Sequence, residues 1–93
     1  MKVRISCQDK YEAQKLASLV FLKDSNETFI TEILNIFENE LVVALKDKSA
    51  HSVVLKDATQ VELFADFLQS VIEKEHKITD TATYDSDVEI IKS

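Results

Sequence analysis

The alternation of apolar and polar positions predicts a strand at the start of the chain. Within residues 2–7, Val3, Ile5 and Cys7 alternate with charged or hydroxyl-bearing side chains. A period of two residues is typical of a strand with one face buried and the other in water. We therefore expect the first strand to end near Cys7.

Asp9 predicts the start of a helix. Asp9 and, three residues later, Glu12 form a capping-box pattern, in which each side chain reaches an otherwise unpaired amide of the first turn. An apolar stripe with helical spacing follows, formed by Ala13, Leu16, Ala17 and Val20. Four apolar residues fall off that stripe: Tyr11, Leu19, Phe21 and Leu22. Either the helix ends near Leu19 and the chain then packs irregularly, or these four residues form a surface that a second copy of the chain covers.

Residues 27–38 fit two structures. On a helical wheel their apolar residues gather on one side and Ser25 can cap a helix, so the period favours a helix. The abundance of Thr, Phe and Ile favours a strand, and Asn39 can adopt the left-handed conformation of a turn into the next apolar run. We favour the strand and keep the helix as the alternative.

Two further strands are predicted over residues 41–46 and 50–55, because both runs are rich in aliphatic residues and turn-forming Asp47 and Lys48 lie between them. A second helix is predicted from Asp57, which can cap it together with Gln60, to about Lys77. Its apolar residues form one continuous stripe: Val61, Phe64, Ala65, Leu68, Val71 and Ile72.

The last segment, residues 78–93, is expected to be an acidic, mobile tail attached to a globular domain of residues 1–77, because residues 79–87 are small, polar and acidic without a period. The end of this tail resembles a SUMO-interacting motif, in which a short aliphatic strand pairs with a sheet edge and preceding acids meet a basic patch. The residues that carry the resemblance are Asp85, Asp87, Val88, Glu89, Ile90 and Ile91.

The predicted order is therefore β-α-β-β-β-α, which indicates an α+β domain with an open, mainly antiparallel sheet and both helices on one face. That order resembles the small open-faced sandwiches of the histidine-containing phosphocarrier proteins. Those proteins present a phosphorylatable histidine at the start of the first helix, where this chain has Asp9, Lys10 and Tyr11. No site is therefore transferred from them.

The composition excludes several classes of function, because the 93 residues include no glycine and no proline. Loops that cradle phosphate groups depend on glycine, so a nucleotide or other cofactor is not expected. The length favours a single domain. No apolar run approaches the roughly 20 residues that a bilayer requires, and Cys7, the single cysteine, cannot form an intramolecular disulfide. We expect a cytoplasmic protein that does not bind membranes.

The formal net charge of −6 is unevenly distributed. Residues 1–23 carry five basic and two acidic side chains, whereas residues 24–45 carry no basic residue and five acidic ones: Asp24, Glu27, Glu32, Glu38 and Glu40. Direct nucleic-acid binding needs a basic surface and is not expected. Spaced carboxylates can instead imitate phosphates and compete for a basic cleft, although small proteins also carry acids for solubility alone.

The candidate chemical groups do not form a recognisable catalytic or metal site. His51 lies between Ser49 and Ser52, but neither serine has the setting of an oriented nucleophile. Cys7 lacks a Cys-x-x-Cys partner and is expected to be a small, half-buried apolar residue. One cysteine and two distant histidines do not have zinc spacing, and the acids of residues 85–89 imitate a calcium loop only until Ile90, where that loop needs glycine.

These observations predict a non-enzymatic protein that works by binding another protein with a basic surface. The most concrete partner is a nucleic-acid-handling protein whose basic cleft the acidic segment would occupy. The alternative is a regulatory or assembly subunit that forms a homodimer through the surplus apolar residues of the first helix.

Overall fold

A computed structural model describes residues 2–21, 30–73 and 77–93 of the protein. In chain order they form β1 (Lys2–Ser6), α1 (Lys10–Val20), β2 (Ile30–Phe37), β3 (Glu40–Leu45), β4 (Ala50–Val54), α2 (Ala58–Ile72), β5 (Ile78–Tyr84) and β6 (Asp87–Lys92). Asp9 and Asp57 cap the two helices as predicted. The Asp9 carboxylate accepts a hydrogen bond from the Glu12 N–H at 2.9 Å, and the Asp57 carboxylate accepts one from the Gln60 N–H at 3.0 Å.

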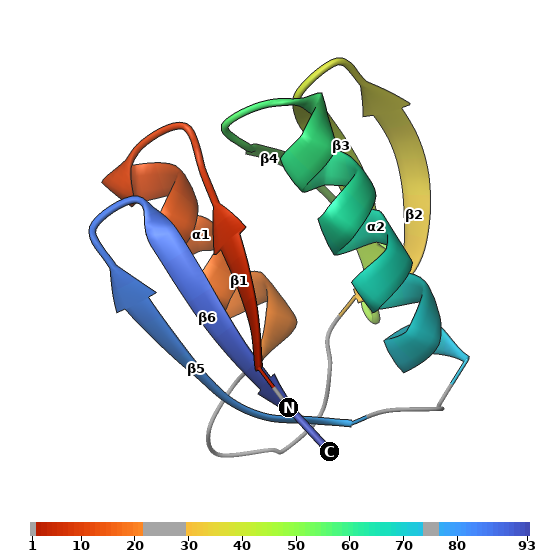
Figure 1. Ribbon diagram of the computed structural model, residues 1–93. Coiled ribbons are helices and arrows are strands. Elements are labelled where there is room, and N and C mark those ends of the chain that lie inside the picture. Colours follow the sequence, from red (N-terminus) through yellow and green to blue (C-terminus); the bar gives the residue numbers. More distant parts are fainter. Residues whose placement is uncertain (1, 22–29, 74–76) are drawn as a thin grey trace.

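The elements form two lobes, which lie side by side in Figure 1. Strands β1, β6 and β5 make one antiparallel sheet in the order β1-β6-β5, and β2, β3 and β4 make another in the order β2-β3-β4. Helix α1 packs against β5 and β6, and helix α2 packs against β2 and β3. We call β1, α1, β5 and β6 the terminal lobe and β2, β3, β4 and α2 the central lobe.

The two lobes share one core and are joined where β1 and β4 end. A single cluster of buried apolar side chains includes residues from both sheets and both helices. Cys7 and Leu55 form an isolated antiparallel bridge. Beside it, the Gln8 N–H donates to the Val54 carbonyl at 3.1 Å and the Lys56 N–H donates to the Ser6 carbonyl at 3.0 Å. Backbone hydrogen bonds therefore hold the lobes together at the centre of the molecule.

The order β-α-β-β occurs twice along the chain, first as β1-α1-β2-β3 and then as β4-α2-β5-β6, and we call these the two halves of the sequence. Each element of the first half matches the element at the same place in the second half. Each helix packs mainly on the hairpin that belongs to the other half of the sequence, since α1 contacts β5 and β6 while α2 contacts β2 and β3. The halves are thus interlocked. The first residues of the first three matching pairs of elements are 48 positions apart: Lys2 and Ala50, Lys10 and Ala58, Ile30 and Ile78. For β3 and β6, which start at Glu40 and Asp87, the separation is 47 positions.

The α+β class and the β-α-β-β-β-α order of the first six elements are confirmed. Residues 30–37 form a strand, as favoured, because β2 and β3 pair as a hairpin around a two-residue turn. Helix α1 ends at Val20, close to the predicted end at Leu19. The strands divide between two sheets, so each helix covers a sheet of its own.

The prediction of a mobile tail over residues 78–93 was wrong, because β5 and β6 form a paired hairpin and β6 also pairs with β1. Ile78, Val88 and Ile90 are fully or almost fully buried in the shared core. The segment is rich in threonine, which favours strands, but it carries few apolar residues. Its burial depends on β1, which is distant in sequence.

Within residues 2–21, 30–73 and 77–93, three turns contain a residue with positive φ although the chain has no glycine. Glu38 and Asp85 stand at equivalent positions of the two hairpins, with φ of 54° and 56°, and Lys48 has φ of 70°. The left-handed position of the first hairpin is Glu38 and not Asn39 as expected. Asn39 serves a different purpose, because its side-chain amide donates to the Leu55 carbonyl at 3.0 Å and so ties the turn to the end of β4.

Candidate protein-interaction surface

The apolar residues proposed as a self-association surface on the first helix are largely core residues. Leu19 is 7% exposed and Phe21 is 6% exposed, so the prediction that they form an exterior contact was wrong. Leu19 lies in the last turn of α1 and Phe21 is the extended residue that follows the helix, and both side chains belong to the shared core. Tyr11 is exposed at 70%, and Leu22 lies outside the described residues.

The proposed recognition strand over residues 85–91 is already paired within the fold. Asp87, Val88, Glu89, Ile90 and Ile91 belong to β6, the middle strand of its sheet, so both of its edges are already paired within the molecule. Asp85 lies in the preceding turn. A SUMO-type partner needs a strand with a free edge, and the prediction was therefore wrong for the folded protein.

The predicted acidic surface falls on the β2–β3 hairpin where the structure describes it. Glu32 and Glu38 are exposed and Glu40 is half-buried. Asp24 and Glu27 lie outside the described residues. The three described acids are thus carried by one hairpin of the central lobe.

The distribution of charge between the lobes is more informative than its distribution along the chain. The central lobe with its connections, residues 30–73, has eight acidic residues and three lysines. The other described residues, 2–21 and 77–93, have six acidic and six basic residues. Most of the net negative charge of the described residues therefore belongs to the central lobe.

Ion pairs between described residues lie in the terminal lobe. They join Lys2 to Glu89, Arg4 to Asp87 and Lys15 to Glu12. The hydroxyl of Ser6, followed by the guanidinium of Arg4, lowers the pKa of Asp87 below its ordinary value. The acids of the terminal lobe are therefore largely engaged within the fold.

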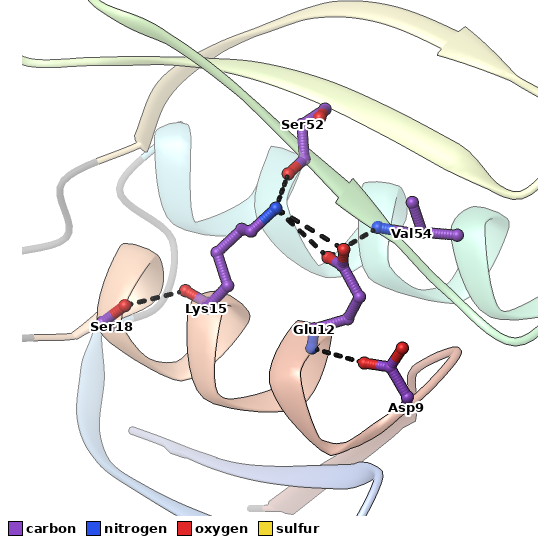
Figure 2. A network of polar contacts seen from close by, with 6 residues as sticks. All are labelled: Asp9, Glu12, Lys15, Ser18, Ser52 and Val54. Atoms are coloured by element: carbon purple, nitrogen blue, oxygen red, sulfur yellow. Dashed lines mark hydrogen bonds and ion pairs between the residues drawn. The ribbon is translucent and has the colours of Figure 1, made fainter.

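Glu12 and Lys15 also connect the lobes, as Figure 2 shows. The Glu12 carboxylate accepts from the Val54 N–H of β4 at 3.2 Å, and the Lys15 ammonium donates to the Ser52 carbonyl of the same strand at 3.1 Å. Gln60 occupies in α2 the position that Glu12 occupies in α1, and its side-chain carbonyl accepts from the Ser6 N–H of β1 at 2.8 Å. These contacts satisfy backbone groups on the inner edges of both sheets.

Strand β2 carries the most exposed apolar side chains of the central lobe. Leu34 is 47% exposed, Ile36 is 49% exposed and Phe37 is 66% exposed. Among the described residues the strand lies at the outer edge of its sheet, with β3 as its one neighbour. The acids Glu32 and Glu38 flank these residues in sequence. An acidic surface with an apolar centre therefore runs along one sheet edge, and we call residues 32–38 the β2 surface.

Asp47, Ser49 and His51 lie together, but not as a nucleophilic triad. The Ser49 hydroxyl donates to the Asp47 carboxylate at 2.5 Å and lies 2.9 Å from Nε2 of His51. A nucleophilic serine gives its proton to histidine, whereas here the serine proton is directed to the aspartate. The hydroxyl and the backbone N–H of Ser49 lower the pKa of Asp47. The cluster stabilises the turn between β3 and β4.

Cys7 is a small apolar residue of the core as expected, but it is fully buried and not half-buried, at 3% exposure beside the bridge between the lobes. Burial, assisted by the nearby carboxylates of Glu12, Asp87 and Asp9, raises the pKa of its thiol from 9.0 to about 12. A thiol in this environment is a poor nucleophile at neutral pH, because the thiolate is the reactive form.

The described residues contain no group of three or more His, Cys, Asp or Glu side chains placed to hold a metal ion. Over the same residues, neither helix has the length and apolar character needed to cross a bilayer.

Comparisons of the chain with protein-family models, curated proteins and solved structures give no match. The fold therefore defines a small α+β protein of two interlocked β-α-β-β units, and the β2 surface is its candidate site.

The sequence alone indicated the acids of this surface but not its apolar centre. Leu34, Ile36 and Phe37 gather with the other apolar residues of this segment on one side of a helical wheel, a pattern that does not predict their exposure on an edge strand. A faint signal of the repeat is present at the 48-residue spacing, where identical residues recur in the pairs Asp9 and Asp57, Ala17 and Ala65, Ile30 and Ile78, and Thr31 and Thr79.

Proposed function

We propose that this protein is a non-enzymatic binding module whose acidic central lobe engages a partner protein with a basic surface. The observation that carries the proposal is the segregation of charge, with eight acids against three lysines in residues 30–73 and a balance of six and six in the other described residues. Acids carried only for solubility would not need to gather on one lobe. Complementary charge accelerates association and selects partners.

The most concrete partner is a nucleic-acid-handling protein with a basic cleft. Carboxylates held on a rigid hairpin and an adjoining helix can occupy positions that phosphates otherwise take. Exposed acids on α2, namely Glu62 and Asp66, extend the negative surface beyond the hairpin. Occupation of such a cleft would inhibit the partner by excluding its nucleic acid.

Charge reversal tests this function. The variant Glu32→Lys, Glu38→Lys, Glu40→Lys should bind the partner at least about tenfold more weakly at low ionic strength, which corresponds to about 1.4 kcal/mol. Wild-type affinity should itself fall as salt is added, because exposed charges are screened. The partner is first captured from the native host and identified by mass spectrometry, and the affinity of the purified pair is then measured by titration.

The chain offers a matched control for this experiment. Glu38 and Asp85 occupy equivalent turn positions with positive φ, one in each hairpin. Glu38→Lys should weaken binding and Asp85→Lys should leave binding unchanged, while melting temperatures show that both variants fold. Equal effects of the two reversals, or binding that does not respond to salt, would contradict the proposal.

A further inference from the structure

The outer edge strands of the two lobes provide an internal comparison. β2 and β5 start at the matching residues Ile30 and Ile78, and both show a register shift directly after their first residue. β2 has a second register shift, between Ile33 and Asn35, which inserts Leu34. From there to the turn the strands match again, with Phe37 opposite Glu40 and Tyr84 opposite Asp87.

Matching positions of the two edges differ in chemistry. Ile36, paired with Leu41, corresponds to Thr83, paired with Val88. Phe37 corresponds to Tyr84, whose ring lies under the Arg4 guanidinium at 5.2 Å. The position that Ile36 occupies in β2 is thus occupied by a polar residue in β5. Apolar side chains on an exposed edge strand promote pairing with another chain.

The exposed apolar residues of β2 point to both faces of the sheet. Ile36 shares a face with buried Leu41, because residues directly opposite in a ladder point the same way, and Phe37 shares the other face with Glu40. A partner that lay on one face would cover only one of the two side chains. A strand alongside the edge would contact both.

The backbone of this edge also offers hydrogen bonds. Phe37 and Glu40 close a two-residue turn, and pairs in an antiparallel ladder alternate between hydrogen-bonded and non-hydrogen-bonded positions. The N–H and C=O of Ile36 are therefore directed away from β3, toward the open edge. Because the register shift at Leu34 interrupts the ladder, the regular stretch available to a partner is short and centred on Ile36.

We infer that the edge of β2 receives an extended segment of the partner, with lysine or arginine beside apolar residues, as a fourth strand of the central-lobe sheet. The inference rests on the proposed function, since the partner is taken to be basic. The flanking acids Glu32 and Glu38 select basic side chains in that segment. A second copy of this chain fits less well, because its own hairpin would bring further acids to the same edge.

The test uses the full-length protein and a synthetic peptide that alternates lysine and valine, with a peptide that alternates glutamate and valine as the control. Amide NMR spectra are recorded during titration. The lysine peptide should shift amides of residues 35–37 and leave those of β5 unchanged, and the glutamate peptide should shift neither. Shifts at β5, equal binding of both peptides, or no shift would overturn the inference. So would shifts at residues 35–37 on raising the protein concentration without peptide, because they would indicate a second copy.

Variants of the edge separate backbone from side-chain recognition. Ile36→Pro removes the outward N–H without removing a hydrogen bond to β3, and it should weaken peptide binding at least about tenfold. Ile36→Thr, which copies Thr83, should weaken it less, and the control Thr83→Pro should have no effect. If Ile36→Pro misfolds, Ile36→Thr still tests the apolar contact. Natural-partner binding that responds to Glu38→Lys but not to either Ile36 variant would overturn the edge inference and leave the proposed function standing.

Discussion

At the scale of single residues, Cys7 shows how position determines chemistry. The thiol is buried beside the bridge that joins the lobes, and its pKa is raised from 9.0 to about 12. The ionised thiolate is disfavoured by the low-dielectric surroundings and by nearby carboxylates. Cys7 thus stabilises the fold as an apolar side chain.

The raised pKa predicts a loss of stability at alkaline pH. The unfolded chain releases the thiol proton near pH 9.0, whereas the folded protein retains it up to about pH 12. The free energy of unfolding should therefore fall between these values by up to about 1.4 kcal/mol per pH unit. Urea unfolding at several pH values measures this slope, which should be smaller in Cys7→Ala. An equal slope in both proteins would show that other groups cause the pH dependence.

At the scale of elements, the third residue of each helix performs a task that local sequence did not reveal. Glu12 and Gln60 were expected to reach back to their own caps. Their side chains instead accept hydrogen bonds from the N–H groups of Val54 and Ser6, which belong to the other lobe in each case. The two side chains that complete the capping pattern therefore connect the lobes.

Removal of these acceptors should destabilise the protein. Glu12→Ala and Gln60→Ala each leave a strand N–H without its partner, and each should lower the free energy of unfolding by about 1–3 kcal/mol. Glu12→Gln and Gln60→Glu keep an acceptor oxygen and should cost less. Gln14→Ala, at an exposed position of α1, is the control. Chemical denaturation provides the measurement, and losses no larger than that of the control would contradict the assigned role.

At the scale of the whole molecule, the two β-α-β-β halves depend on one another. β1 pairs with β6, β4 pairs with β3, and each helix packs mainly on the hairpin of the other half. Neither half contains the strands that cover its own helix. The boundary between the halves lies after Lys48 in the connection of β3 to β4, between Asp47 and Ser49, which are hydrogen-bonded to each other.

This interlocking predicts complementation between fragments. Peptides of residues 1–48 and 49–93 should each lack cooperative thermal unfolding, because each lacks most of the surface that buries its helix. An equimolar mixture should recover the circular dichroism spectrum of the intact protein and a cooperative transition. The midpoint temperature of this transition should rise with the concentration of the fragments, because their assembly is bimolecular. A fragment that unfolds cooperatively as a monomer would show that one half is sufficient.

The sequence by itself determined the elements whose signals are local. Asp9 and Asp57 mark the helix starts, the aliphatic runs mark β3 and β4, and the absence of glycine left the turns to other residues. The sequence also indicated the acids of the first hairpin, because charges can be counted along the chain. Each of these features depends on neighbours within a few residues.

The tertiary structure alone decided which strands pair and which side chains are left exposed. Residues 78–93 become a hairpin because β1 supplies a partner from the opposite end of the chain, and Leu19 and Phe21 are buried by elements from both halves. Ile36 and Phe37 have the composition of core residues but lie on an edge strand. Burial is a property of contacts between distant segments, and an apolar pattern of period 2 or 3.6 does not specify which strand lies at an edge.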